Sequence, residues 1–132
     1  MFFVLPGEIR RAAFSFTSGN GRLQNIMLKV CTLASGSSGN CTYISDGATH
    51  LLIDAGISAR AITNAIASLG ITPGDISAIL ITHEHWDHIR GIEVLEKKWD
   101  IPIYLASEGT YDALRDMHPA LEKRMMSFDT DV

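Results

Sequence analysis

Residues 83–88 read HEHWDH and gather three histidines, a glutamate and an aspartate within six positions. Imidazole nitrogens and a carboxylate oxygen suit Zn²⁺, Mn²⁺ or Fe²⁺, and a cluster without thiolates favours a hydrolytic site over a purely structural one. His83 and His85, one residue apart, can converge on one ion, while Asp87 and His88 can hold a second ion beside it. These four residues are the predicted metal ligands.

Two divalent ions about 3.5–4 Å apart can ionise a bridging water, which then attacks phosphorus or a carbonyl carbon. Asp87 is also the predicted catalytic residue, as a ligand that orients this water, and a helix N-terminus would favour its ionised form. Glu84 and Trp86 alternate with the ligands and are expected to face away, with Glu84 a candidate partner of a ligand. Two alternatives stay open: one structural ion held by all four side chains, and a polar loop without metal.

The pattern around the cluster predicts an α/β fold in which a mixed β-sheet is flanked by helices. Ser58 and Ser107 are expected helix N-caps, and Gly70 is expected at a helix C-terminus. The cluster then lies where a buried strand ends and a helix begins, which is where sites usually form in α/β proteins. The predicted strands are 28–33, 41–45, 49–54, 77–82 and 101–106, and the predicted helices are 59–69, 91–99, 108–117 and 120–126.

The first 26 residues differ from the rest because they show no sustained period and end in the turn-rich stretch TSGNGR. Met27 then opens a clean strand pattern, MLKVCTL. We therefore expect residues 1–26 to be an N-terminal extension that reflects a misassigned start, and residues 27–132 to form the domain. A real N-terminal arm or an extra edge strand is the alternative.

The composition is that of an ordinary globular chain, with 46% hydrophobic and 20% charged residues among 132. The formal net charge of −4 argues against a generally basic surface for nucleic acid, although a local basic groove stays compatible with it. No apolar run has the length of a membrane span, and the N-terminus lacks the charge order of a secretory signal, so the protein is expected to be cytoplasmic. Cys31 and Cys41 are expected to be buried free thiols rather than a disulfide.

The sequence THEHWDH resembles the HxHxDH signature of metallo-β-lactamase-fold metallohydrolases. Four segments together resemble the WalJ (YycJ) subgroup of that family, between about Met27 and Leu114. They are LASGSSGN at 33–40, LLIDAG at 51–56, ILITHEHWDHIRG at 79–91 and IPIYLASEGTYDAL at 101–114. Position 86 departs from the pattern, because it holds Trp where the subgroup is expected to have a small residue.

The resemblance implies that His83 and His85 bind the first metal and that Asp87 and His88 bind the second. It also implies a supporting role for Asp54 near the site, although a plain turn residue explains Asp54 equally well from sequence. The serine-glycine loop would lie beside the site and could hold a phosphate, a tight connection of small residues being the alternative. The loop residues concerned are Ser35, Ser37, Ser38 and Asn40.

The family fold implied by the resemblance is a four-layer αββα sandwich made of two similar halves. Residues 27–132 resemble only its N-terminal half, so the domain is expected to be truncated at its C-terminus. The family's two later ligand histidines and its bridging aspartate have no counterpart here. His50 and His118 do not fit those motifs and are expected to be ordinary exposed or hydrogen-bonded residues.

The function expected from these features is that of a divalent-metal-dependent hydrolase with two ions, Zn or Mn, or else Fe. The resemblance implies a phosphodiesterase or nuclease that acts through a dinuclear metal-bound hydroxide on nucleic acid or another phosphodiester. A truncated, non-catalytic metal-binding or interaction fragment is the alternative. A nuclease predicts a basic rim, for which the candidates are Arg60, Arg90, Lys97 and Lys98. The sequence leaves the oligomeric state undecided.

Overall fold

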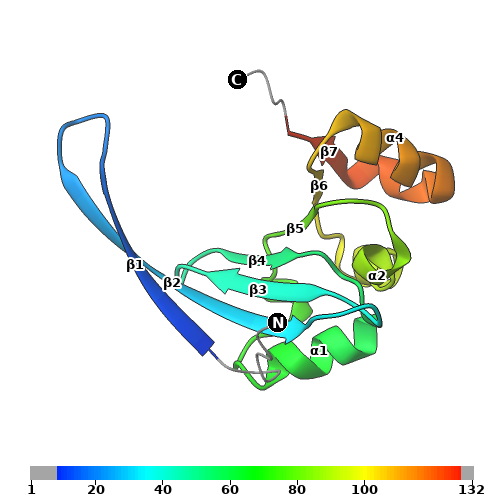
Figure 1. The fold of residues 1–132 in the computed structure, drawn as a ribbon, viewed down its shortest axis with the longest axis horizontal. Helices are drawn as coiled ribbons and strands as arrows, with labels where there is room; N and C mark the ends of the chain where they lie inside the picture. Colours follow the sequence, from blue (N-terminus) through cyan, green and yellow to red (C-terminus); the bar gives the residue numbers. More distant parts are fainter. Residues whose placement is uncertain (1–8, 129–132) are drawn as a thin grey trace.

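The computed structural model describes residues 9–128, which form a seven-stranded mixed sheet with flanking helices (Figure 1). The strands lie side by side in the order in which the chain makes them. The first four are antiparallel neighbours and the last four are parallel neighbours. They are β1 (Ile9–Thr17), β2 (Leu23–Ala34), β3 (Cys41–Ser45), β4 (His50–Ile53), β5 (Ala78–Ile81), β6 (Ile103–Leu105) and β7 (Met125–Ser127).

The helices begin where the sequence supplies capping groups. The Ser58 hydroxyl accepts a hydrogen bond from Ala61 N, and the Ser107 hydroxyl accepts one from Thr110 N, so both expected N-caps are confirmed. Gly70 adopts φ +80° just beyond the first helix, as a C-terminal cap requires. The helices are α1 (Ala59–Ala67), α2 (Trp86–Ile89), α3 (Ile92–Trp99) and α4 (Glu108–Met117), with 3₁₀ turns at Pro73–Asp75 and Pro119–Arg124.

The hydrophobic core lies on one face of the sheet. A single row of register partners crosses six strands on this face, and every member is 6% exposed or less: Cys31, Tyr43, Leu52, Ile79, Ile103 and Met125. Ile62 and Ile66 of α1, Leu95 of α3 and Leu114 of α4 pack into the same cluster. Because side chains alternate across a strand, the neighbouring row points to the opposite face. The mixed α/β arrangement expected from sequence is confirmed.

Two expected elements differ from the structure. The prediction of a helix at 120–126 is wrong at its C-terminal end. A 3₁₀ turn occupies Pro119–Arg124, and Met125 opens strand β7. Met125 pairs with Ile103 and is buried, so a tertiary strand partner overrides the local helical pattern. The strand expected from residue 28 begins earlier, at Leu23, because β1 pairs with it from Leu23 to Cys31.

The β1–β2 hairpin projects from the body of the sheet as a long two-stranded arm (Figure 1). Its pairing runs from Ile9 opposite Cys31 to Thr17 opposite Leu23, across the domain boundary expected at Met27. That boundary stays a prediction, and residues 1–8 lie outside the described part of the chain. In the part that the structure describes, no helix has the length and apolar character to cross a membrane.

Both cysteines are buried free thiols, as expected. They lie on the paired strands β2 and β3, but Cys31 is opposite Tyr43, and Cys41 is opposite Ala34. Burial, with a smaller contribution from the negative charge of Asp54, raises the pKa of the Cys41 thiol to about 12. The thiolate is the reactive form, so this thiol is chemically silent at neutral pH.

We therefore expect neither cysteine to react with iodoacetamide at pH 8 while the chain is folded. Both thiols should react rapidly in concentrated urea, where a cysteine recovers a pKa near 8.5. Mass spectrometry after timed quenching measures the two rates. Rapid labelling of Cys41 in the folded chain would contradict the burial described here.

Candidate metal centre

The parallel alignment of β4 and β5 brings the first polar residues together. Ile53, the last residue of β4, is the register partner of Leu80, and Asp54 N donates to Leu80 O at 2.7 Å. Asp54 follows β4, while Thr82 and His83 follow β5, so all three lie at the same edge of the sheet. Asp54 has φ +62°, a left-handed conformation that aspartate tolerates better than most residues. The chain therefore turns sharply as soon as β4 ends.

The Asp54 carboxylate is the buried centre of a hydrogen-bond network, its residue being only 5% exposed. Oδ1 accepts from Thr82 N at 2.8 Å, and Oδ2 accepts from the Thr82 hydroxyl at 2.8 Å. Oδ2 also lies 2.7 Å from His88 Nδ1. An ionised carboxylate can only accept, so Nδ1 of His88 carries the proton and Nε2 keeps its lone pair.

Thr82 extends the hydrogen-bond network of Asp54 to His83. Its hydroxyl proton is directed to Asp54, so its oxygen accepts from His83 Nδ1, 3.0 Å away. The proton of His83 is thereby held on Nδ1, and Nε2 is again left with a lone pair. Sequence analysis missed Thr82, although its position as the polar residue that ends the apolar run SAILI was a signal for it.

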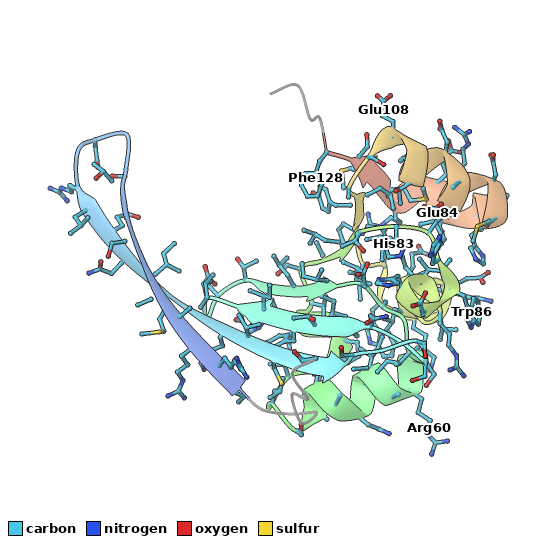
Figure 2. The ribbon with its side chains drawn as sticks, viewed as in Figure 1. Arg60, His83, Glu84, Trp86, Glu108 and Phe128 are labelled. Carbon is cyan, nitrogen blue, oxygen red and sulfur yellow. The ribbon has the colours of Figure 1, made fainter. Side chains whose placement is uncertain are left out.

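The structure brings all four predicted ligands together, at the corner where Figure 2 labels His83. The ring centroid of His83 lies 3.9 Å from that of His88 and 4.6 Å from that of His85. Asp87 Oδ2 lies 3.6 Å from His88 Nε2. Among residues 9–128, no three His, Cys, Asp or Glu side chains already surround one point as a formed metal shell would. The donor atoms of the four predicted ligands therefore lie close together but do not surround a common point.

The residues present nevertheless fit divalent metal by their chemistry. Three imidazoles and one carboxylate form a nitrogen- and oxygen-donor set suited to Zn²⁺, Mn²⁺ or Fe²⁺. Two of the imidazoles, His83 and His88, are held in the tautomer that offers Nε2 to an ion. A carboxylate behind a ligand histidine is the arrangement that orients such rings in metal sites. The assignment of two ligands to each of two ions stays a prediction.

Three backbone segments meet tightly behind the ligands. Asn40 N donates to Asp87 O, Gly56 N donates to Asn40 O, and Ala55 N donates to His88 O, each at 2.8 Å. A Cβ added at Gly56 would stand 1.7 Å from Asp87 O and 2.6 Å from Asn40 N. Only a residue without a side chain fits there, so Gly56 permits the close approach of the segments that carry Asp54 and Asp87.

The serine-glycine loop contributes mainly through Asn40. The Asn40 amide closes the loop on Gly36, accepting from Gly36 N and donating to Gly36 O, and also lies 3.3 Å from both Asp87 Oδ2 and His88 Nε2. The N–H groups of Gly36, Gly39 and Asn40 already donate to protein oxygens. Those three N–H groups are therefore not free to bind an anion. The candidates that remain in this loop are the exposed residues Ser35, Ser37 and Ser38.

The other residues considered from sequence lie apart from the network. Trp86 is 65% exposed and points outward from α2, away from His83 (Figure 2). His50 Nδ1 lies 2.7 Å from the Tyr43 hydroxyl, and His118 Nδ1 lies 3.4 Å from Glu93 Oε2. Both histidines are hydrogen-bonded or ion-paired residues away from the cluster, as expected.

Comparison with known proteins supports the resemblance stated from sequence. The model of the metallo-beta-lactamase superfamily matches residues 34–126. Exodeoxyribonuclease WalJ of Streptococcus pneumoniae strain D39 is 45% identical over 94 residues, which are 71% of this chain and 35% of that protein. Exodeoxyribonuclease YycJ of Bacillus anthracis is 42% identical over 90 residues, 68% of this chain and 34% of that protein. The chain thus spans about a third of the length of these relatives.

The fold also matches solved structures. A B3 metallo-beta-lactamase with an active-site glutamic acid superposes with a TM-score of 0.60 at 24% identity, over 77% of this chain and 42% of that one. At this identity the match establishes the fold alone. The expected fold class, a mixed sheet with helices of the metallo-β-lactamase type, is confirmed.

Replacing Thr82 with valine should lower the affinity for Zn²⁺ or Mn²⁺ by about 10- to 100-fold, because the shape is kept but the support of His83 is lost. Thr82→Ser keeps the hydroxyl and should bind metal nearly as the parent does. Calorimetric titration measures the affinity, and ¹⁵N chemical shifts of the ring report the His83 tautomer without metal. Equal affinities for the two variants, with His83 protonated on Nδ1 in both, would show that the Thr82 hydroxyl does not support His83.

Gly56→Ala should destabilise the chain by several kcal/mol, since two hydrogen-bonded backbone groups stand where the methyl would lie. Gly74→Ala is the matched control, because its nearest contact would be 3.6 Å from Thr72 Oγ1, and it should change stability by less than about 1 kcal/mol. Urea unfolding followed by circular dichroism compares them. Similar free energies of unfolding for the two variants would show that the segments separate easily.

Proposed function

The chain belongs to the metallo-beta-lactamase superfamily, and from that premise we propose that it carries metal-binding residues of a divalent-metal-dependent phosphodiesterase that acts on nucleic acid. The observation that carries the proposal is the network centred on Asp54. It holds His88 directly and His83 through Thr82, and it keeps Nδ1 rather than Nε2 of both rings engaged with Asp54 or Thr82. If Asp54 only closed a turn, its carboxylate would not need to hold two histidine rings in this way.

The choice of substrate rests on the relatives rather than on the cluster. Metal held by imidazole and carboxylate groups can assist hydrolysis at phosphorus or at a carbonyl carbon. The two relatives described above are named exodeoxyribonucleases. Their similarity favours a phosphodiester of DNA as the substrate of the protein to which these residues contribute.

The proposed roles follow from the position of each donor. His83 and His85 would hold one divalent ion, and Asp87 and His88 a second, with Zn or Mn as the candidates. When bound, the ions would supply an ionised water and neutralise charge on the phosphate. Asp87 would also orient that water.

Three further residues would act by positioning. Asp54 and Thr82 would keep the rings of His83 and His88 turned toward the metals, a role that their hydrogen bonds support. Asn40 Nδ2, 3.3 Å from Asp87 Oδ2, steadies that carboxylate. The exposed Arg90, directly after α2, is a candidate for contact with substrate phosphates, whereas Arg60 on α1 points away from His83 (Figure 2).

The proposal predicts about two ions per chain after reconstitution with Zn²⁺ or Mn²⁺, the number that a two-metal clamp needs. Asp87→Asn and His85→Ala should each retain fewer ions and should not cleave end-labelled DNA or a nitrophenyl phosphodiester. Elemental analysis of the purified chain measures the metal, and product release measures the hydrolysis.

His118→Ala is the matched control, because it removes an imidazole that contacts Glu93 rather than the cluster. It should hold as much metal as the parent chain. Near-zero metal in parent and variants alike would contradict the proposal and favour a non-catalytic interaction fragment. Metal retained equally by parent and His85→Ala would overturn the ligand assignment.

A further inference from the structure

The β1–β2 arm, Ile9–Cys31, carries positive charge in a chain that is otherwise acidic. Its sequence has four basic residues and no Asp or Glu. Residues 32–128 have seven basic and twelve acidic residues, and the whole chain has a net charge of −4. The metallo-beta-lactamase model matches residues 34–126, so the arm lies outside the part of the chain that this family describes. The basic residues of the arm are Arg10, Arg11, Arg22 and Lys29.

Two of these cations stand directly opposite each other across the hairpin. Arg11 is the register partner of Lys29, and both residues are exposed. Opposed side chains in an antiparallel pair lie about 5 Å apart, and like charges at that distance destabilise the pair. No carboxylate of residues 9–128 forms an ion pair with Arg11, Arg22 or Lys29. Their placement by itself opposes stability, and it suits a bound anion that would neutralise both charges.

The cations surround the arm rather than form a single stripe. Lys29 precedes Cys31 by two residues, so it shares the face of the sheet on which the hydrophobic core lies. Arg10 is the register partner of Val30, and it points to the opposite face. Arg22 lies in the turn that joins β1 to β2. Positive charge is therefore present on both faces of the arm and at its turn.

The shape of the arm fits a groove of duplex DNA. Pairing of β2 with β3 ends at Lys29, so from there to its turn the arm is a ribbon of two strands that projects from the sheet (Figure 1). The major groove of B-DNA is about 12 Å wide and admits a two-stranded β-ribbon. At about 3.4 Å per residue, the stretch from Lys29 to Arg22 spans about 24 Å, or about seven base pairs. Its two charged ends can therefore contact phosphates along one groove.

We propose that the arm binds duplex DNA, with the ribbon in the major groove and its cations on the phosphates. The choice of DNA among polyanions rests on the proposed function, since two relatives are named exodeoxyribonucleases. Charged residues on an edge strand can also serve only to prevent pairing with another chain. Acidic side chains protect an edge equally well, and the arm has none. Binding to an anion accounts for the single sign of its charge.

Strand β2 links the arm to the candidate metal centre. It ends at Ala34, where the serine-glycine loop begins, and Asn40 of that loop contacts Asp87. Along β2, Lys29 lies about 17 Å from Ala34, which corresponds to about five base pairs of duplex. One duplex is long enough to bridge this separation. The arm thus adds a site for the duplex part of the substrate at a distance from the proposed chemistry.

The test is the binding of a fluorescent duplex of about 20 base pairs, measured by anisotropy in EDTA between about 50 and 200 mM salt. Arg11→Gln/Lys29→Gln should bind about 10-fold more weakly or worse than the parent chain. The slope of log affinity against log salt should fall in magnitude by about two, because each phosphate contact contributes about 0.9. Arg22→Gln should lower the slope by about one. The parent should prefer the duplex to either single strand, because only the duplex has the groove.

Arg115→Gln/Lys123→Gln is the matched control, because it removes the same charge from α4 and the 3₁₀ turn after it. This control should bind the duplex as the parent does. Urea unfolding separates a binding role from a structural one. Arg11→Gln/Lys29→Gln should be at least as stable as the parent, because it removes the opposed like charges. Lower stability of this variant with unchanged affinity for DNA would overturn the proposal.

Three other results would also overturn it. They are equal affinities of the arm variant and the control, equal affinity of the parent for duplex and single strands, and binding to anionic phospholipid vesicles without binding to the duplex. Because EDTA removes divalent metal, failure of the metal centre leaves this binding unchanged. Failure of the arm in turn leaves the metal content of the chain unchanged, so the two proposals fail separately.

Discussion

The buried carboxylate of Asp54 is the interaction on which the candidate centre depends. It accepts from a backbone N–H, a hydroxyl and an imidazole, and so it ties the end of β5 to the start of α2. A buried carboxylate is costly unless its oxygens are matched in this way. With its oxygens hydrogen-bonded, the Asp54 carboxylate fixes the ring orientation of His88 directly and of His83 through Thr82. The parallel pairing of β4 with β5 makes this possible, because it fixes Asp54 beside Thr82.

Backbone geometry complements the carboxylate. The hydrogen bonds of Asn40, Ala55 and Gly56 hold three segments together without using the side chains that face the centre. The ligand candidates therefore remain free for chemistry while their main chain is fixed. Support of this kind orients the rings of His83 and His88 before any ion arrives, which lowers the ordering cost of binding.

The two faces of the sheet have different roles. One face is closed by α1, α3 and α4 and supplies the hydrophobic core of the described residues. The other face is equally continuous in register but retains accessible apolar area. Both faces meet at the edge that carries Asp54 and Thr82. This places the packing of the sheet and the candidate chemistry in one structural unit.

The sequence by itself determined the local features of this protein. The HEHWDH cluster indicated metal chemistry, Ser58 and Ser107 fixed two helix starts, and the alternation of apolar residues identified five of the seven strands. Each of these signals acts between residues close in the chain, so a pattern records it. The resemblance also indicated a role near the site for Asp54, whose turn position alone left that role undecided.

Tertiary structure decided the rest. The hydroxyl of Thr82 gains its role only because β4 delivers a carboxylate to it, and Gly56 is required only because Asp87 O approaches from a distant segment. Met125 became a strand residue because β6 offered it a partner. These outcomes depend on groups that are far apart in sequence and adjacent in space, which no local pattern of side chains encodes.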